Sequence, residues 1–181
     1  MSRTTLITGG AASGKSRWAI SYFEACNNVL YLDTSPKIDQ DTLSRIKYSN
    51  EHNMVEWEII ANVQEPLDFI KDHKFFILDN LASYTSNVIK SMCPNVELLN
   101  NRMMKEIQKK IIDDITSVMN EIVELDANLI IITIEPGFSV TPMNKEQQNF
   151  REILGAVNQR IANICNEVYL SASGIQFKIK E

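Results

Sequence analysis

Short apolar runs alternate along the chain with stretches in which apolar residues recur every three or four positions. The runs are rich in Ile, Leu and Val and predict strands, at residues 4–8, 28–33, 55–60, 74–79, 128–134, 167–171 and 175–179. The run 55–60 alternates and suggests a strand with one face in water. The helical spacing predicts helices, at residues 15–23, 40–48, 96–125 and 146–165. Strands that alternate with helices predict an α/β fold, a three-layer sandwich around a mostly parallel sheet.

The last two runs differ from the others because Ser173-Gly174 separates them with only a turn's length of chain. A connection this short joins antiparallel neighbours. We therefore expect an antiparallel edge strand at the C-terminal end of the sheet.

Length, charge and cysteine content limit the class of protein. With 181 residues the chain is expected to form one domain, 1–181, with a substantial core. A net charge of −5 does not indicate a nucleic-acid partner, and no apolar run approaches the roughly 20 residues of a membrane span. The first strand begins directly after residue 3 and leaves no room for a signal peptide. Together with three scattered cysteines, Cys26, Cys93 and Cys165, which are interpreted as reduced packing residues, this predicts a cytoplasmic protein.

One motif carries most of the predicted chemistry. Between the first strand and the first helix the chain has the pattern G-x-x-x-x-G-K-[ST], formed by Gly9, Gly10, Ala11, Ala12, Ser13, Gly14, Lys15 and Ser16. Glycines let backbone N–H groups approach phosphate oxygens, and the helix that follows points its positive end at the same anion. Lys15 is expected to reach the β- and γ-phosphates and the Ser16 hydroxyl to bind Mg²⁺. The alternative is a glycine-rich turn that binds nothing.

Polar residues follow two further strands at the edge where ligands of parallel sheets gather. Asp79 ends an apolar strand as a Walker-B acid does and is expected to hold Mg²⁺; its alternative is a cap on the next helix. Asp33, Thr34 and Ser35 follow the second strand and either contact nucleotide or Mg²⁺ or cap the segment after them. The long loop 135–142 is a candidate lid or substrate wall, or an ordinary surface loop.

These motifs together resemble a known family, the bifunctional adenosylcobinamide kinase / adenosylcobinamide-phosphate guanylyltransferases of cobalamin biosynthesis. The resemblance runs almost end to end and is carried by several segments: residues 8–17 (TGGAASGKSR), 31–35 (YLDTS), Arg45-Ile46 with Trp57, 78–81 (LDNL) with Ser86-Asn87, 135–137 (EPG), 150–152 with 157–160 (FRE…VNQR), and 173–175 (SGI). It implies a RecA-like P-loop NTPase fold and a homotrimer. It also implies an enzyme that uses ATP or GTP with Mg²⁺ to phosphorylate adenosylcobinamide and then transfers GMP to the product.

In that family the second reaction passes through a guanylylated histidine. The matching position here is Ser49, and the family's Arg-Pro four residues later is Asn53-Met54. A serine hydroxyl without an adjacent base is a weak nucleophile, so the resemblance predicts the kinase activity more strongly than the guanylyl transfer. His52 lies three residues beyond Ser49 and is either a displaced nucleophile or a surface histidine.

Two other classes of function stay open at this point. The changes around Ser49 also fit a nucleotide-binding regulatory protein without catalysis. The phosphate loop alone fits a kinase of another small alcohol.

Overall fold

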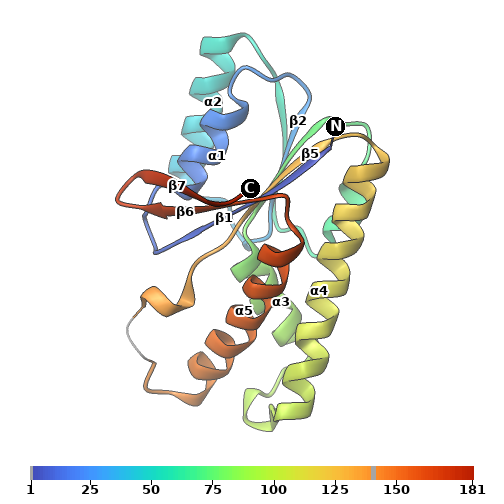
Figure 1. Cartoon of the computed structure of the whole chain (residues 1–181), viewed down its shortest axis with the longest axis vertical. Helices are drawn as coiled ribbons and strands as arrows, with labels where there is room; N and C mark the ends of the chain where they lie inside the picture. Colours follow the sequence, from blue (N-terminus) through green and yellow to red (C-terminus); the bar gives the residue numbers. More distant parts are fainter. Residues whose placement is uncertain (1, 140–141) are drawn as a thin grey trace.

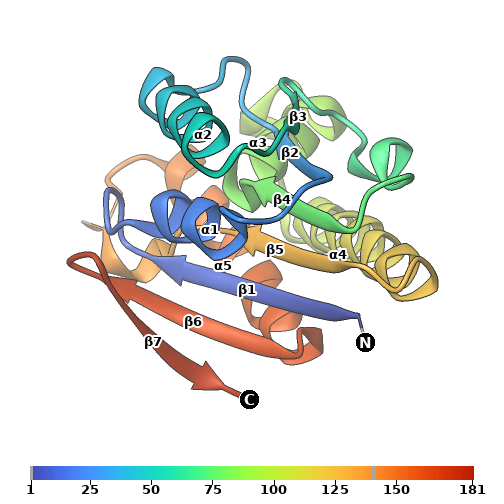
Figure 2. The same cartoon turned by 90° about the horizontal axis from the view of Figure 1, so that it is seen from above.

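The computed structural model describes residues 2–139 and 142–181 of the chain. They form one seven-stranded sheet with the strand order β3-β2-β4-β5-β1-β6-β7 (Figures 1 and 2). The strands are β1 (Arg3–Gly9), β2 (Val29–Asp33), β3 (Trp57–Ile60), β4 (Phe75–Asp79), β5 (Asn128–Ile132), β6 (Glu167–Ala172) and β7 (Ile175–Lys180). Every pairing is parallel except that of β6 with the edge strand β7. The predicted mostly parallel sheet with an antiparallel C-terminal edge is confirmed.

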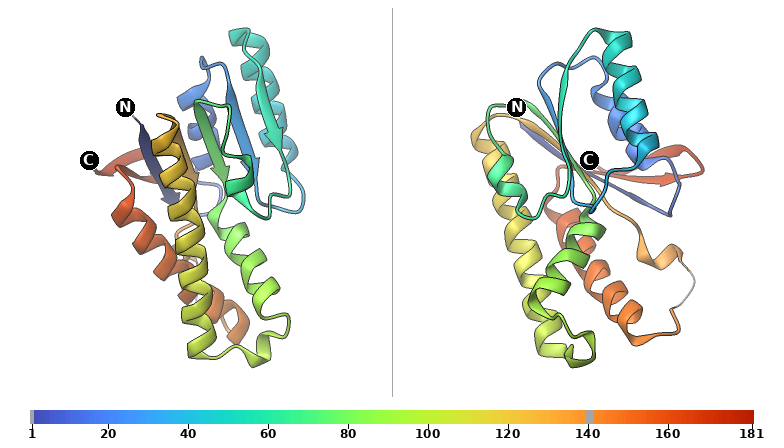
Figure 3. Two further views of the ribbon diagram at one scale, coloured as in Figure 1. Left: turned by 90° about the vertical axis from the view of Figure 1, so that its right-hand side faces the viewer. Right: turned by 180° about the vertical axis from the view of Figure 1, so that it is seen from behind.

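Helices cover both faces of the sheet. They are α1 (Lys15–Phe23), α2 (Gln40–Asn53), α3 (Leu81–Met92), α4 (Asn101–Glu124) and α5 (Lys145–Ile164), with short 3₁₀ turns η1 (Pro66–Phe69), η2 (Val96–Leu98) and η3 (Pro136–Phe138). Helices α1 and α2 lie on one face and α3, α4 and α5 on the other (Figures 1 and 3). Successive strand residues alternate between the two cores, so that Leu6 packs in the core with α3–α5 and Ile7 in the core with α1. The three layers of the predicted sandwich follow from this alternation.

The strand order brings two predicted functional segments to one edge. The strand β5 lies between β1 and β4, and its Ile132 is the register partner of both Ile7 and Asp79. Neighbouring strands lie about 4.8 Å apart, so the start of the glycine loop and the end of β4 are separated by only about 10 Å across the sheet. The loop and Asp79 therefore face the same space at the carboxyl ends of the strands.

Some boundaries differ from those expected. Helix α2 continues past Tyr48 to Asn53. The sequence did not predict this extension, because the last turns are polar and carry no apolar stripe. Helix α4 begins at Asn101 rather than near 96, since the Asn100 side chain accepts hydrogen bonds from the backbone N–H groups of the first turn and sets the start there. Leu98 consequently lies outside the helix and is 66% exposed. The apolar pattern assigned no element to the residues of α3.

None of the helices in the described part of the chain is long and apolar enough to cross a membrane.

Candidate nucleotide-binding site

The glycine loop joins β1 to α1 in a conformation that depends on its glycines. Gly14 has a φ of 97° and immediately precedes Lys15, the first residue of α1, so the free N–H groups of that helix start at the loop. Gly9 has a φ of 151°, and a Cβ atom built there would lie 2.2 Å from the carbonyl oxygen of Ser171. Only glycine fits at position 9, and this close approach brings the loop against β6.

Lys15 lies across the loop. Its Nζ atom donates hydrogen bonds to the carbonyl oxygens of Gly10 at 2.6 Å and Gly9 at 3.2 Å, and the side chain is only 7% exposed. Burial lowers the pKa of the Lys15 ammonium, and the negative charge of Asp79 raises it in part. The lysine is thus held at the loop by neutral carbonyl acceptors, which a phosphate oxygen would outcompete because it pairs the ammonium with an opposite charge.

Asp79 ends β4 beside this lysine. The Tyr31 hydroxyl donates a hydrogen bond to its carboxylate, the Ser16 hydroxyl lies close to it, and both hydroxyls lower its pKa. Burial outweighs them and raises the pKa of Asp79 above the ordinary value of 3.8, with a further contribution from the charge of Asp33. A serine hydroxyl and a nearby carboxylate are the oxygen ligands that a P-loop protein offers to Mg²⁺. The two residues predicted to hold the metal therefore lie together.

Asp79 is not the cap of the following helix. The side chain of Asn80 accepts a hydrogen bond from the Ser83 backbone N–H at 2.8 Å and occupies the N-cap position of α3. The Asp79 carboxylate is therefore not used in a helix cap, and it accepts the hydrogen bond of Tyr31.

The residues at the end of β2 and just after it mainly stabilise the edge of the sheet at which the site lies. Thr34 is fully buried; its hydroxyl donates to the carbonyl oxygen of Asn80 at 2.7 Å, and its backbone N–H donates to that of Asp79. The buried Asp33 carboxylate accepts the backbone N–H of Ser35 at 2.6 Å in a local turn. Helix α2 has its own cap, Asp39. Asp33 and Thr34 thus fix the chain end of β2 next to β4, and Ser35, which is half-buried, lies at the surface of this edge.

The C-terminal hairpin supports the loop from the side opposite α1. The Ser13 carbonyl oxygen accepts hydrogen bonds from the Ser171 hydroxyl at 2.7 Å and from the Gly174 backbone N–H at 3.0 Å. A Cβ atom on Gly14 would lie 3.3 Å from the Gly174 Cα atom, so the two glycines pack closely. Sequence reasoning gave the hairpin no role in the site beyond its family-specific Ser173-Gly174.

A polar cleft of about 780 Å³ runs over the loop between α1, α2 and the hairpin turn. Residues from four parts of the chain line it: Ala12, Ser13, Gly14, Lys15, Ser16, Arg17, Trp18, Ser21, Asp39, Asp41, Thr42, Arg45, Gly174 and Gln176. Its size is in the range of sites for nucleotide-sized ligands. The contributions of Asp39, Asp41 and Arg45 were not predicted, because only the folded chain brings the start of α2 opposite the loop. Trp18 of α1 was not predicted either.

The two residues considered for guanylyl transfer lie elsewhere on α2. Ser49 is 7% exposed, and Asn53 donates a hydrogen bond to its carbonyl oxygen at 3.0 Å. His52 is exposed and stacks on Tyr48 with ring centroids 5.9 Å apart. Neither residue lines the cleft, and the two have different environments in spite of their helical spacing.

The loop after β5 starts at the site. The backbone N–H of Glu135 donates to the carbonyl oxygen of Gly9, and the turn η3 follows directly. Residues 140 and 141 of the predicted lid segment lie outside the described residues. The Asn144 side chain caps α5 by accepting the backbone N–H of Gln147 at 2.8 Å.

The loop that precedes α1, its lysine and the acidic residue two strands away define a P-loop nucleotide-binding protein. Comparison with protein families is more specific. The family described as cobinamide kinase / cobinamide phosphate guanyltransferase matches residues 5–179, and the chain belongs to this family of enzymes.

Curated relatives are similar to this chain over nearly its full length. The chain is 28% identical over 179 residues to the bifunctional adenosylcobalamin biosynthesis protein CobU of Escherichia coli (strain K12), covering 97% of this chain and 98% of that protein. It is 29% identical over 180 residues to the protein of the same name from Salmonella typhimurium (strain LT2), with the same coverage. It is also 24% identical to the bifunctional adenosylcobalamin biosynthesis protein CobP of Pseudomonas aeruginosa (strain PAO1), covering 97% and 96% of the two chains.

Proposed function

We propose that this chain is the adenosylcobinamide kinase of a cobalamin pathway, with ATP or GTP as the phosphoryl donor. Family membership supports the choice of acceptor. The observation that carries the phosphoryl-transfer chemistry is that the Ser16 hydroxyl and the buried Lys15, both at the start of α1, lie near the Asp79 carboxylate.

In this proposal the protein acts by positioning and by charge. The N–H groups at the start of α1 and the Lys15 ammonium bind the β- and γ-phosphates, and Lys15 exchanges its bonds to the Gly9 and Gly10 carbonyl oxygens for bonds to phosphate. Ser16 and Asp79 would hold Mg²⁺, which neutralises charge on the phosphate oxygens when it is bound. Metal binding requires an ionised Asp79, and because burial raises its pKa, this carboxyl ionises at a higher pH than an exposed one.

Guanylyl transfer has weaker support than the kinase reaction. Among the described residues that line the cleft there is no histidine, Ser49 is buried in α2, and His52 stacks on Tyr48 at the surface. We propose that the kinase reaction is retained and that transfer of GMP is lost or greatly slowed.

A mass spectrum of the products tests both halves. The protein is incubated with adenosylcobinamide, GTP and Mg²⁺. Adenosylcobinamide phosphate as the only corrinoid product is the expected result. A GDP-linked cobinamide would show that the transferase half survives, and the absence of any phosphorylated corrinoid with ATP or GTP would contradict the kinase assignment.

Two expectations that rest on the family resemblance belong to the same proposal. The protein is a homotrimer and acts in the cytoplasm on small molecules. Light scattering coupled to gel filtration measures the mass of the assembly. A mass of three times the chain mass of 20.6 kDa is expected, and another multiple would contradict the trimer.

A further inference from the structure

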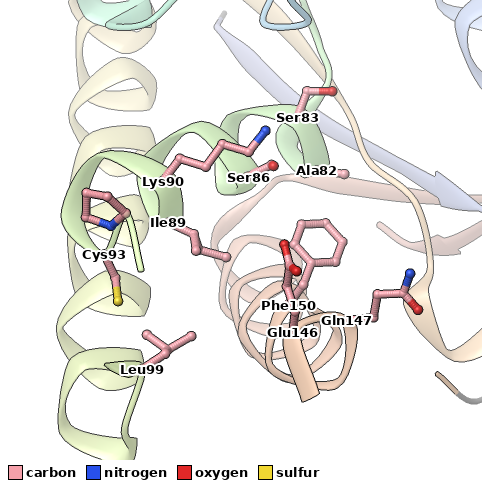
Figure 4. Close-up of a pocket in the computed structure, with 11 residues that line it drawn as sticks. Ala82, Ser83, Ser86, Ile89, Lys90, Cys93, Leu99, Glu146, Gln147 and Phe150 are labelled. Carbon is pink, nitrogen blue, oxygen red and sulfur yellow. The ribbon is translucent and has the colours of Figure 1, made fainter. Parts of the chain in front are cut away.

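A second cavity lies on the other side of the sheet, between α3 and the first turns of α5 (Figure 4). It has a volume of about 330 Å³. Apolar side chains line most of it, among them Ile89, Leu99 and Phe150, while Ser86 and Gln147 add polar groups. Figure 4 shows that side chains from both helices point into the space between them. A concave, mostly apolar site with a few polar groups is the usual form of a small-molecule site.

The cavity begins close in the chain to the proposed site of phosphoryl transfer. Its lining residue Ser83 lies in the first turn of α3, and the N-cap of that helix, Asn80, directly follows Asp79. The Ser83 hydroxyl is also 3.5 Å from that of Ser35, at the end of β2. A ligand in this cavity would therefore extend toward the same strand ends as the triphosphate in the cleft, but from the opposite face of the sheet.

The chemistry of the lining does not suit a nucleoside triphosphate. Lys90 is the one cation among the described lining residues, and it is exposed. Glu146 supplies a carboxylate at the same opening, which would repel a triphosphate. The same set suits an uncharged amide, because Ser86, Gln147 and Lys90 can donate hydrogen bonds and Glu146 can accept them from an amide NH₂ group.

We propose that this cavity binds an edge of the corrinoid acceptor, with the apolar side chains against the macrocycle and the polar ones on its amide arms. The proposal rests on the assigned kinase function. A volume of 330 Å³ holds only part of a macrocycle, so the remainder, with its aminopropanol hydroxyl, extends past Ser83 toward Asp79 and the γ-phosphate. The two substrates then approach the strand ends from opposite faces of the sheet.

The test fills the cavity without touching the nucleotide cleft. In Ser86→Phe a large ring enters the cavity from a half-buried position of α3. The matched control is Ser117→Phe, an exposed position on α4 away from both sites. We expect Ser86→Phe to raise KM for adenosylcobinamide at least about 10-fold, as expected when bulk blocks a small-molecule pocket, while the Kd for the nucleotide stays at the wild-type value.

A second pair of variants removes a polar contact without adding bulk, in case Ser86→Phe fails to fold. Gln147→Ala should raise KM for adenosylcobinamide about 3- to 10-fold, since a lost hydrogen bond is worth about that factor, and Gln108→Ala on α4 should not. Equal KM values in the cavity variants and their controls, with an active wild-type enzyme, would overturn this inference alone. A wild-type protein that binds nucleotide but phosphorylates no cobinamide would instead overturn the proposed function.

Discussion

The Ser171 hydroxyl donates a 2.7 Å hydrogen bond to the backbone carbonyl oxygen of Ser13, although the two residues are 158 positions apart. Through this bond the hairpin at the C-terminal end of the chain holds the phosphate loop, which lies near the N-terminal end of the chain. A loop that must present several N–H groups to one anion gains affinity when its shape is fixed beforehand. The hairpin is therefore a positioning element of the nucleotide site.

Removing the Ser171 hydroxyl tests this role. The Gly174 N–H still bonds Ser13 in Ser171→Ala, so we expect a loss of about 1 kcal/mol in the free energy of unfolding. The Kd for nucleotide should rise about 3- to 10-fold because the loop is less ordered. Urea unfolding and titration calorimetry measure the two quantities. The control is Ser117→Ala, where the exposed hydroxyl only bonds its own helix, and a nucleotide Kd that is the same in both variants would argue against the positioning role.

Two adjacent glycines of the loop should respond differently to a methyl group. In Gly9→Ala the Cβ atom would lie 2.2 Å from the Ser171 carbonyl oxygen, at a φ of 151° that favours glycine. In Gly10→Ala no atom lies within 4 Å of the new Cβ. We expect Gly9→Ala to lower the free energy of unfolding by at least about 2 kcal/mol and Gly10→Ala by less than about 1 kcal/mol. Thermal unfolding compares them directly, and equal melting temperatures would mean that β6 does not confine the loop.

The ionised form of Asp79 is expected to reduce the free energy of unfolding of the nucleotide-free protein. Its pKa is raised in the folded state, so the folded protein binds the proton more tightly than the unfolded chain does. This favourable contribution is present at low pH and is lost as the pH rises through the raised pKa. Urea unfolding of Asp79→Asn from pH 4 to 8 should therefore show a variant whose stability relative to wild type increases with pH. A stability difference that decreases with pH would show that the net effect of the surroundings is to lower this pKa.

The same substitution should remove most of the kinase activity. Without the carboxylate, only the Ser16 hydroxyl remains to bind Mg²⁺ from the protein, and we expect the rate to fall at least about 100-fold. In the wild-type protein, affinity for Mg²⁺-nucleotide should increase as the pH rises above 3.8 through the raised pKa of Asp79, and in Asp79→Asn this pH dependence should be absent. A variant that keeps the wild-type pH profile would exclude Asp79 as a metal ligand.

His52 offers a direct test of the guanylyl-transfer question. It stacks on Tyr48 at the surface and does not line the cleft, so His52→Ala should keep kinase activity within about twofold of wild type. Intact-protein mass spectrometry after incubation with GTP and Mg²⁺ should detect no covalent guanylyl adduct in either protein. An adduct in wild type that disappears in His52→Ala would identify this histidine as a displaced nucleophile.

Features encoded locally could be predicted from the sequence. The glycine loop, Lys15 and the acid that ends β4 lie in short segments whose residue types indicate their roles. The alternation of strands and helices predicts the layers. Helix α2 was predicted too short because its last turns, which include His52, are polar and carry no periodic apolar signal. This error concealed that Ser49 lies buried within a helix.

Long-range contacts could not be predicted in the same way. Tyr31 donates to Asp79 across two neighbouring strands, and Ser171 reaches Ser13 from the far end of the chain. Nothing in the residues around Tyr31 or Ser171 indicates these partners, since each depends on the strand order. The lining of the cleft by Asp39 and Arg45 likewise depends on how α2 packs against α1.

We expect the Lys15 ammonium to be essential for phosphoryl transfer to adenosylcobinamide. The most direct measurement is the initial rate of adenosylcobinamide phosphate formation, with ATP or GTP and Mg²⁺, for wild type and Lys15→Ala, with circular dichroism to confirm that both are folded. Within the described part of the chain, the Lys15 ammonium donates hydrogen bonds to loop atoms alone, so the variant should fold. We predict a rate at least about 1,000-fold below wild type, as expected when a charge that stabilises the transition state is removed. A folded Lys15→Ala protein that retains wild-type turnover would show that Lys15 is not needed for phosphoryl transfer.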